Sequence, residues 1–520
     1  MGGDQAAGRP LGPFKSWPCV GNGLRRPESD REDFDRLLNA DPIGAENGVQ
    51  LEDSRAPVVS RSSAQWHTLS DGIAGDVILP DSPDYDTARI PALARFDHVR
   101  PQAIVRCQTP VDVAMTLELA RGLGLPVAAR SGGHCFAGRS TTSGVVIDLS
   151  PMTSTSLQDG QAVVGAGTRL GGLYDSLSVH GRTIPAGCGP TVGIAGLTLG
   201  GGLGILGRKY GLTADHLVGA QVVLPDGRVL DCDEHHDREL FWALRGAGHG
   251  QFGIVTSLTF RTVPTPACTT FHLTWPIAHA AGIVQAWQRW APAAVDELAA
   301  SLLVTAPDDP EEPAVVHIFG AMLGSQSDTD ALLAQLPTPT EPSSVIRVSG
   351  SHREAKRYLA EHGPGDQRPG GHVYSKSEFF TRLLPASTIS ALIHHLATRR
   401  SAGVSRELDF TPWGGAYNRV PFDATAFPHR QARFLLKHAV VVPADAPAGQ
   451  RHQARDWLGN SWAAATPWAN GGVYPNFPDN NLDDSGYHYY GANYERLTRV
   501  KARYDPDEFL HFPQSIPPRP

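Results

Sequence analysis

Cysteine is scarce in this chain of 520 residues, and long apolar runs are missing. The six cysteines form no C-x-x-C pair, so we expect neither a disulfide-rich scaffold nor a metal site. No stretch approaches the roughly 18 uninterrupted apolar residues that a membrane-spanning helix needs. Positive charge is not in excess either. The net charge of -8 gives no electrostatic reason to expect a nucleic acid or an anionic membrane as a partner.

The start of the chain lacks the apolar run after a basic segment that marks a signal peptide. Cytoplasm is therefore the expected compartment. Residues 1–60 are polar and interrupted by proline and glycine, and we interpret them as an N-terminal extension. Because domains hold roughly 100–200 residues each, the rest of the chain is expected to form two or three units.

Helix and strand signals alternate between residues 75 and 265. Thr109 followed by Pro110 is typical of a helix start and predicts a helix that ends at Gly122 and Gly124. Further along, the pattern predicts strands at 125–130, 144–150, 161–167 and 253–263, a hairpin at 219–232 and helices at 168–177 and 236–248. This alternation indicates mixed α and β structure. Residues 276–470, with proline- and aspartate-rich loops, read as a second domain.

The run GLGILG at residues 202–207 fits the dinucleotide fingerprint G-x-G-x-x-G. That fingerprint requires a strand directly before it. The preceding TVGIAGLTLGG is too rich in glycine for a buried parallel strand, and Asp226 is explained locally by the hairpin turn. A nicotinamide-dependent dehydrogenase therefore stays the alternative interpretation.

The glycines between residues 187 and 207 still need a physical reason, because each costs about 0.5–1 kcal/mol against alanine in regular structure. Apolar residues such as Val192, Ile194 and Leu197 interleave them, which disfavours a floppy surface loop. Such backbone packs close to something flat or anionic, and its N–H groups can bind phosphate oxygens. Two nucleophilic side chains, His134 in RSGGHCFAG and Cys188 in PAGCGPTVG, stand among these bare segments.

Four motifs in order resemble the berberine-bridge-enzyme-like branch of the FAD-linked oxidases, in the vanillyl-alcohol oxidase superfamily. They are RSGGHCFAG, PAGCGPTVGIAGLTLGGGLGILGRKYGL, GAGHGQFGIVT and the tail YYGANYERL with YDPDEFLHFPQSIPP. The resemblance covers roughly residues 75–265 and 470–518 and is loose in between. It implies an α+β fold: a two-lobed PCMH-type FAD-binding domain (75–270), a substrate domain with an antiparallel sheet and flanking helices (271–469), and a C-terminal return segment (470–520).

The resemblance implies that FAD is bound covalently twice, through His134 and Cys188. A neutral imidazole and a thiolate are good nucleophiles, and flanking glycines leave space for the ring. The neighbouring Cys135 matches no attachment position and is interpreted as packing. The further cofactor-binding residues implied are Arg130, Ser131, Gly132, Gly133, Ala137, Gly138, Gly193, Gly196, Gly200, Gly253, Ile254, Val255, Asn476, Tyr489 and Asn493. For Tyr489, Asn493 and Gln514, a purely scaffolding role is an equal alternative.

The resemblance also places Tyr474, in GGVYPNF, beside the flavin as the base that removes a hydroxyl proton. This role requires surroundings that lower its pKa. Asp409 is the second catalytic candidate, with Trp413 and Tyr417 as alternatives, and the consequence of His249 is left open. The expected reaction is oxidation of a hydroxyl group, or of an amine or C–H, in a sugar, glycoside or other natural product. O2 is the expected acceptor, giving H2O2.

A catalytically inactive flavin-fold binding protein is the third hypothesis, and the presence of Tyr474 argues against it. The substrate and the oligomeric state cannot be read from the sequence.

Overall fold

The computed structural model describes residues 58–362 and 371–519, and the compact unit Val59–Pro520 holds the sheets and cavities considered below. The predicted extension at 1–60 lies outside the described residues, except for its last three. The helices are α2 (Val58–Gly72), α3 (Tyr85–Ala88), α4 (Pro110–Gly122), α5 (Leu170–Ser178), α6 (Ile194–Leu199), α7 (Gly207–Tyr210), α8 (Arg238–Ala247), α9 (Ala280–Trp290), α10 (Gln326–Leu333), α11 (His352–His362), α12 (Ala386–Ala397), α13 (Ala416–Arg419), α14 (Ala448–Ala465), α15 (Ser485–Tyr490) and α16 (Tyr494–Tyr504).

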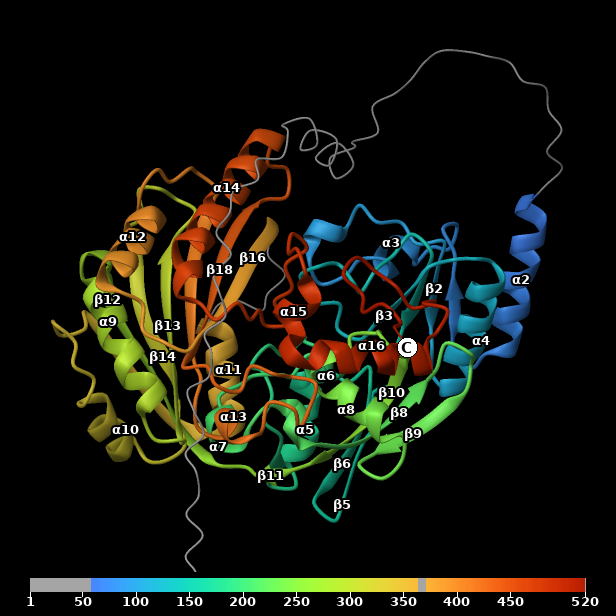
Figure 1. Ribbon diagram of the computed structural model, residues 1–520, viewed down its shortest axis with the longest axis horizontal. Helices are drawn as coiled ribbons and strands as arrows, with labels where there is room; N and C mark the ends of the chain where they lie inside the picture. Colours follow the sequence, from blue (N-terminus) through green and yellow to red (C-terminus); the bar gives the residue numbers. More distant parts are fainter. Residues whose placement is uncertain (1–57, 363–370, 520) are drawn as a thin grey trace, which may run out of the picture. The chain divides into compact units, whose positions relative to one another are not determined.

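Two sheets and their helices form the part of the molecule labelled β2 to β10 in Figure 1. The four-stranded sheet has the order β1 (Asp76–Ile78), β2 (Ala103–Arg106), β4 (Val145–Asp148), β3 (Val127–Arg130). The five-stranded antiparallel sheet has the order β5 (Thr155–Gln158), β6 (Gln161–Gly165), β10 (Ile254–Arg261), β8 (Leu217–Val223), β9 (Val229–Asp233). A short pair, β7 (Arg182–Thr183) with β11 (Val263–Pro264), lies beside them.

The sequence signals in this region are confirmed. The Thr109 side chain accepts the N–H of Asp112 in a capping box, with Pro110 at the first position of α4. The hairpin of β8 and β9 pairs Val223 with Val229 around the expected turn. No strand precedes GLGILG, because Ile194–Leu199 is a helix, so the structural context of a dinucleotide fingerprint is missing there.

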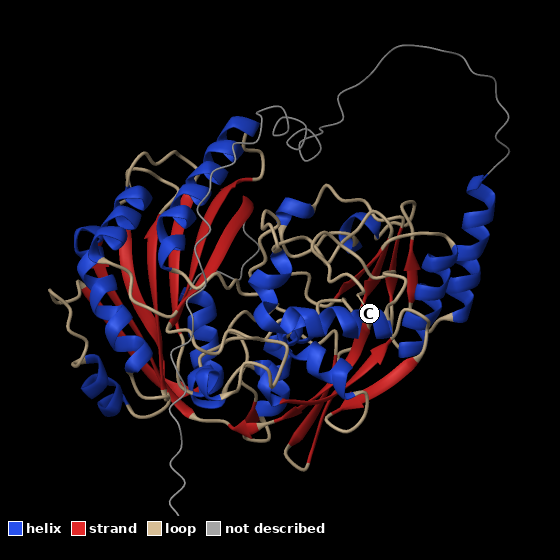
Figure 2. Cartoon of the chain, viewed as in Figure 1, coloured by secondary structure: helices blue, strands red, loops and turns tan. Residues whose placement is uncertain are grey.

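The remaining large sheet has seven antiparallel strands, and helices flank it in Figure 2. Its order is β15 (Ser344–Ser351), β12 (Ala267–Pro276), β14 (Val315–Met322), β13 (Leu298–Ala306), β17 (Ser405–Pro412), β18 (Phe434–Pro443), β16 (Gly371–Phe380). Alternate residues such as Leu408, Phe410 and Leu436 pack in one core with α9, α12 and α14. The residues between them face the opposite side, because side chains alternate along a strand.

A separate core joins the two smaller sheets with the end of the chain. Val473, Tyr489, Leu497, Leu510 and Ile516 pack in it together with residues of β2, β4, β6, β8 and β10. The last residues therefore return to this side, and the C-terminus lies beside α16 in Figure 1. The exact domain boundaries at 270 and 470 stay a prediction.

Within the described part of the chain, no helix is both long enough and apolar enough to cross a membrane. The cytoplasmic location stays a prediction.

Candidate functional site

A cavity of about 460 Å³ lies between the glycine loops and the seven-stranded sheet. Residues from both sides line it, so segments that are far apart in the sequence meet there. Of the residues singled out in the sequence, the following line it: Ser131, Gly132, Gly133, His134, Cys135, Cys188, Gly193, Gly196, His249, Gly253, Ile254, Val255, Asp409, Tyr417, Tyr474 and Asn476.

Two glycine loops touch each other along one wall of the cavity. A Cβ atom at Gly132 would overlap the backbone N of Gly193, and one at Gly193 would overlap Ser131. Ser131 fixes the first loop by donating its hydroxyl hydrogen to the carbonyl of Ala166 at 2.6 Å. Gly133 has φ of +77°, a left-handed conformation that favours glycine. The bare backbone is therefore needed for the loops to approach each other.

The same wall leaves room for a flat ligand. Gly196 lies inside α6, and a Cβ built on it meets no atom within 4 Å, so the backbone there borders open space. Ile254 and Val255 begin β10 and line the far end of the cavity. Open space against glycine backbone, beside exposed loop N–H groups, fits the FAD expected from the sequence.

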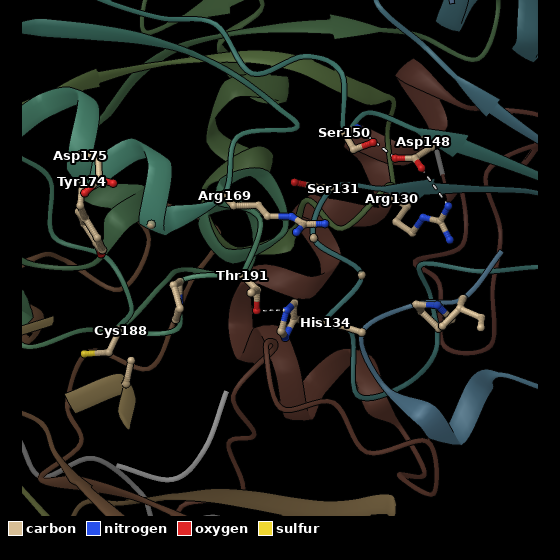
Figure 3. Close-up of a pocket in the computed structure, with 18 of the residues that line it drawn as sticks. Arg130, Ser131, His134, Asp148, Ser150, Arg169, Tyr174, Asp175, Cys188 and Thr191 are labelled. Carbon is tan, nitrogen blue, oxygen red and sulfur yellow. Dashed lines mark hydrogen bonds and ion pairs between the residues drawn. The ribbon is translucent and has the colours of Figure 1, made fainter. Parts of the chain in front are cut away.

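His134 lies at the end of the first loop. Its Nε2 and the hydroxyl of Thr191 are 3.0 Å apart, as Figure 3 shows. Cys188 is half-buried on the second loop, and in Figure 3 its sulfur is turned away from the His134 ring. The ammonium of Lys356, from α11, lies beside Cys188 and donates to the carbonyl of Gly187 at 3.1 Å. Burial lowers the pKa of Lys356.

Tyr474 lies where the glycine loops meet the sheet. Its hydroxyl oxygen accepts hydrogen bonds from the N–H of Gly202 and from the Asn476 amide, both at 3.1 Å. Its own hydroxyl hydrogen has no acceptor among residues 58–362 and 371–519, and Tyr474 lines the cavity. Burial raises the pKa of Tyr474 to about 12. The expectation of a lowered pKa for Tyr474 is therefore wrong, because the loss of solvent outweighs the hydrogen-bond donors.

His249 extends this hydrogen-bond chain, and its role could not be read from the sequence. Its Nε2 lies 2.8 Å from the Asn476 side-chain oxygen, so Nε2 carries the hydrogen. Burial lowers the pKa of His249 to about 4, which keeps the ring neutral. Its Nδ1 is buried with no hydrogen-bond partner among the described residues, and the backbone φ is +28°. A buried ring nitrogen beside the cavity is thus left without a partner among residues 58–362 and 371–519.

Asp409 faces the cavity from the seven-stranded sheet. It pairs in register with Lys437 on β18, and the ammonium lies 3.1 Å from the carboxylate. Burial lowers the pKa of Lys437, but Asp409 and Glu407 outweigh it, so the net shift is upward. Burial raises the pKa of the Glu407 carboxyl group. The sheet therefore presents charged groups to the cavity, whereas the loops present backbone.

Several residues that the sequence predicted as site residues are held by other protein groups and do not form the main lining of this cavity. Arg130 is buried in an ion pair with Asp148 at 2.9 Å. Four of the others form hydrogen bonds within the protein: the Ala137 carbonyl accepts from Asn480, the Tyr489 hydroxyl accepts from the N–H of Asp479, Asn493 donates to the carbonyl of Phe422, and Gln514 donates to the carbonyl of Asp479. Three more are packed against side chains: Gly138 against Phe96, Gly200 against Asn476, and the buried Trp413 against Tyr417. For Tyr489, Asn493 and Gln514 these contacts match the scaffolding alternative. The predicted cofactor roles of these residues, and the catalytic alternative at Trp413, stay predictions.

The sequence analysis did not name Lys437 or Thr191 as site residues, and it named His249 without giving it a role. Lys437 is the single charge in the apolar run FLLKHAVVV, which could have indicated a function. No local pattern indicates Thr191, because its importance comes from its contact with His134 across the fold.

Comparisons with known proteins agree with this geometry. A family model described as an FAD binding domain matches residues 101–233, and one described as berberine and berberine like matches residues 473–517. The FAD-linked oxidoreductase YgaK of Bacillus subtilis is 34% identical and aligns with 86% of this chain and 97% of its own length. Berberine bridge enzyme-like 12 of Arabidopsis thaliana is 30% identical and aligns with 87% of this chain and 92% of its own length.

The solved structure of Physcomitrella patens BBE-like 1 gives a TM-score of 0.78 at 26% identity, covering 88% of this chain and 99% of that one. This likeness confirms the predicted α+β fold class with its antiparallel sheet. Together the matches confirm that the chain is an FAD-linked oxidase.

Proposed function

The chain belongs to the berberine-bridge-enzyme-like family of FAD-linked oxidoreductases, and on this premise we propose that it oxidises a hydroxyl group of a sugar, glycoside or other natural product. Oxidation of an amine or a C–H group of such a substrate is the alternative within the same proposal. Bound FAD would supply a hydride acceptor at N5, with O2 as the final acceptor giving H2O2. The residues of this chain would hold the cofactor, place the substrate and accept its proton.

His134 and Cys188 are proposed as the two covalent attachment residues. Both line the cavity, and both stand on loops whose glycines leave their side chains unhindered. The Thr191 hydroxyl lies 3.0 Å from Nε2 of His134 and orients the ring, and a neutral imidazole nitrogen is the nucleophile that such an attachment requires. The second bond requires the Cys188 side chain to turn, because its sulfur points away from His134 in Figure 3.

Tyr474 is proposed as the proton acceptor. Two N–H donors converge on its oxygen and favour the phenolate, while burial favours the phenol. The phenolate fraction therefore grows as the pH approaches the high pKa of this group. A substrate hydroxyl placed against Tyr474 would lose its proton to this oxygen as the hydride leaves.

The buried pair of Asp409 and Lys437 is proposed to orient the substrate. Both side chains line the cavity, so a donor and an acceptor are offered together. Hydroxyl groups can satisfy both partners at once. This pairing favours a polyhydroxylated or glycosylated substrate over a purely apolar one.

The observation that carries the proposal is the convergence of His134, the open backbone at Gly196 and the Tyr474 hydroxyl on one cavity. The test is to precipitate the purified protein with acid, wash the pellet, and record flavin absorbance and fluorescence in pellet and supernatant. His134→Ala, Cys188→Ala and the double variant are measured beside the wild type. Cys135→Ala is the matched control, because Cys135 is the neighbouring thiol on the same cavity.

Flavin that stays in the pellet for wild type and both single variants, and leaves only in the double variant, supports two attachments. Release by His134→Ala alone leaves a flavin oxidase with a single attachment and contradicts the role of Cys188. A protein with no flavin in either fraction contradicts the proposed function, and turnover with added nicotinamide would then be measured.

A further inference from the structure

A second cavity, of about 980 Å³, adjoins the first along residues 131–134 and at Cys188. Figure 3 shows residues that line it. Its walls come from residues 87–92, the ends of β2, β3 and β4, the start of α5, and α11. Small-molecule sites in proteins have volumes of about 300–1,000 Å³, so this space is large enough for a ligand of that kind. The cofactor proposed above would border it where residues 131–134 and Cys188 line both cavities, whereas Tyr474 and Asp409 do not line it.

Positive charge dominates the lining of this cavity. Six cationic side chains face three carboxylates; they are Arg106, Arg130, Arg169, Arg353, Lys356 and Arg357, against Asp148, Asp175 and Glu361. Two of the carboxylates are already neutralised, because Asp148 pairs with Arg130 and Asp175 pairs with Arg353. Lys356 is held by backbone carbonyls. The charge that remains for a ligand is therefore positive.

Arg106 and Arg169 supply most of that remaining charge. Neither guanidinium forms a hydrogen bond or ion pair with another residue in 58–362 or 371–519, whereas Arg130 is fully engaged nearby. Arg106 ends β2, and Arg169 stands just before α5. In Figure 3 the Arg169 side chain extends toward the loop that carries Ser131. Two guanidinium groups with no partner among the described residues thus line one cavity from two different elements, and the Arg169 residue is exposed to solvent.

We propose that this second cavity binds a small molecule with at least two negative charges, carried by carboxylate or phosphate groups. The planar guanidinium fork matches both groups in a bidentate manner. Ser150 adds a hydroxyl group on the same walls. The size of the cavity and the presence of two such arginines favour a compact dianion over a single halide or a polymer.

Most of the lining of this cavity differs from that of the flavin cavity, although residues 131–134 and Cys188 line both. The open backbone at Gly196, the β10 residues 253–255 and Tyr474 line the first cavity and not the second, and Arg106 and Arg169 line the second and not the first. The proposal therefore stands whether or not the oxidation proposed above is correct.

The test uses the full-length, flavin-loaded protein and isothermal titration calorimetry. Citrate probes carboxylate recognition, inorganic pyrophosphate probes phosphate recognition, and glycerol is the neutral probe. Arg106→Gln with Arg169→Gln is the variant. Arg228→Gln is the matched control, because Arg228 is an exposed arginine that bonds Asp226 and lines neither cavity. Visible flavin absorbance is recorded for every sample.

We expect saturable binding of citrate or pyrophosphate near one per chain, none of glycerol, and a loss of about tenfold in affinity per arginine removed. Which anion binds more tightly decides between carboxylate and phosphate ligands. Affinity in Arg228→Gln and flavin content in all variants should match wild type. No saturable binding, or equal loss in the control, overturns the proposal. Loss of flavin in the double variant would assign the cavity to the cofactor and overturn it as well.

Discussion

On one side of the cofactor cavity the lining comes from the loops 131–134 and 187–204, where glycine brings backbone to the surface. On the other side it comes from side chains of β13, β14, β17 and β18, presented by a seven-stranded antiparallel sheet. The loops offer the same N–H groups whatever the side chains are. The sheet offers charges, such as Asp409 and Lys437, that depend on which residues alternate onto that face. The first side suits a fixed cofactor and the second a variable substrate.

The largest effect is expected at Tyr474, where the two sides meet. Tyr474→Phe keeps the ring contacts with Phe379, Phe427 and Phe477 but removes the proton acceptor. We expect kcat to fall by about 10²–10⁴-fold. In the wild type, kcat should rise with pH from neutrality upward, because the base must be deprotonated and burial places its pKa near 12.

Steady-state oxidation measured from pH 6 to pH 10 or so checks both expectations. Tyr417→Phe is the control, since Tyr417 lines the same cavity but bonds the carbonyl of Gly204. A rate independent of pH above neutrality would move the base role from Tyr474 to a carboxylate of the sheet.

The next effect concerns the charged pair on the sheet. Lys437→Met leaves Asp409 buried and unpaired, and removing one partner of a buried pair costs about 3 kcal/mol of unfolding free energy. Asp409→Asn should cost a similar amount. The double variant should be less destabilised than the sum of the two, because no uncompensated charge remains. Urea unfolding of the four proteins gives the coupling energy, and strict additivity would show that the two groups do not interact.

The same contrast explains how much the sequence could predict. The cofactor side could be predicted because its residues are contiguous in the sequence. RSGGH begins at the last residue of β3, and the run from Gly187 to Gly207 forms one segment. The helix at 110–122 and the β8–β9 hairpin were readable from local caps and turns. The pairing of Asp409 with Lys437 depends on strand register between segments 28 residues apart, and the lowered pKa of His249 depends on burial. No local pattern encodes either.

Two glycines in the loops can test whether the cofactor is held by closely approaching backbone on this side of the cavity. Gly193→Ala places a Cβ against Ser131 and Gly132, so we expect a loss of about 1–3 kcal/mol in stability and loss of bound flavin. Gly196→Ala meets no protein atom within 4 Å and lies inside α6. Alanine there should stabilise the flavin-free protein by about 0.5–1 kcal/mol while reducing its flavin content. Thermal unfolding and visible absorbance separate the two effects, and a normal flavin content in Gly196→Ala would mean that the cofactor stays away from α6.

The smallest effect is expected from pH acting on His249. Burial, with a smaller contribution from Arg139, lowers its pKa from about 6.5 to about 4 in the folded protein, so the unfolded chain binds the proton first as the pH falls. The stability that the neutral ring contributes is present above pH 6.5, declines between 6.5 and 4, and is lost below 4. His249→Asn should remove this acid sensitivity from the flavin-free protein.

His317 is the matched comparison for His249, because burial also lowers its pKa to about 4, but it lies on β14 outside the cavity. His317→Asn should change the acid sensitivity by a similar amount and leave flavin content untouched. His249→Asn should also change the flavin absorption spectrum, since the unpaired Nδ1 borders the cofactor cavity. Equal flavin spectra for the two variants would show that His249 does not contact the flavin and acts only through its hydrogen bond to Asn476, which in turn bonds Tyr474. The loops would then contact the flavin through backbone groups alone.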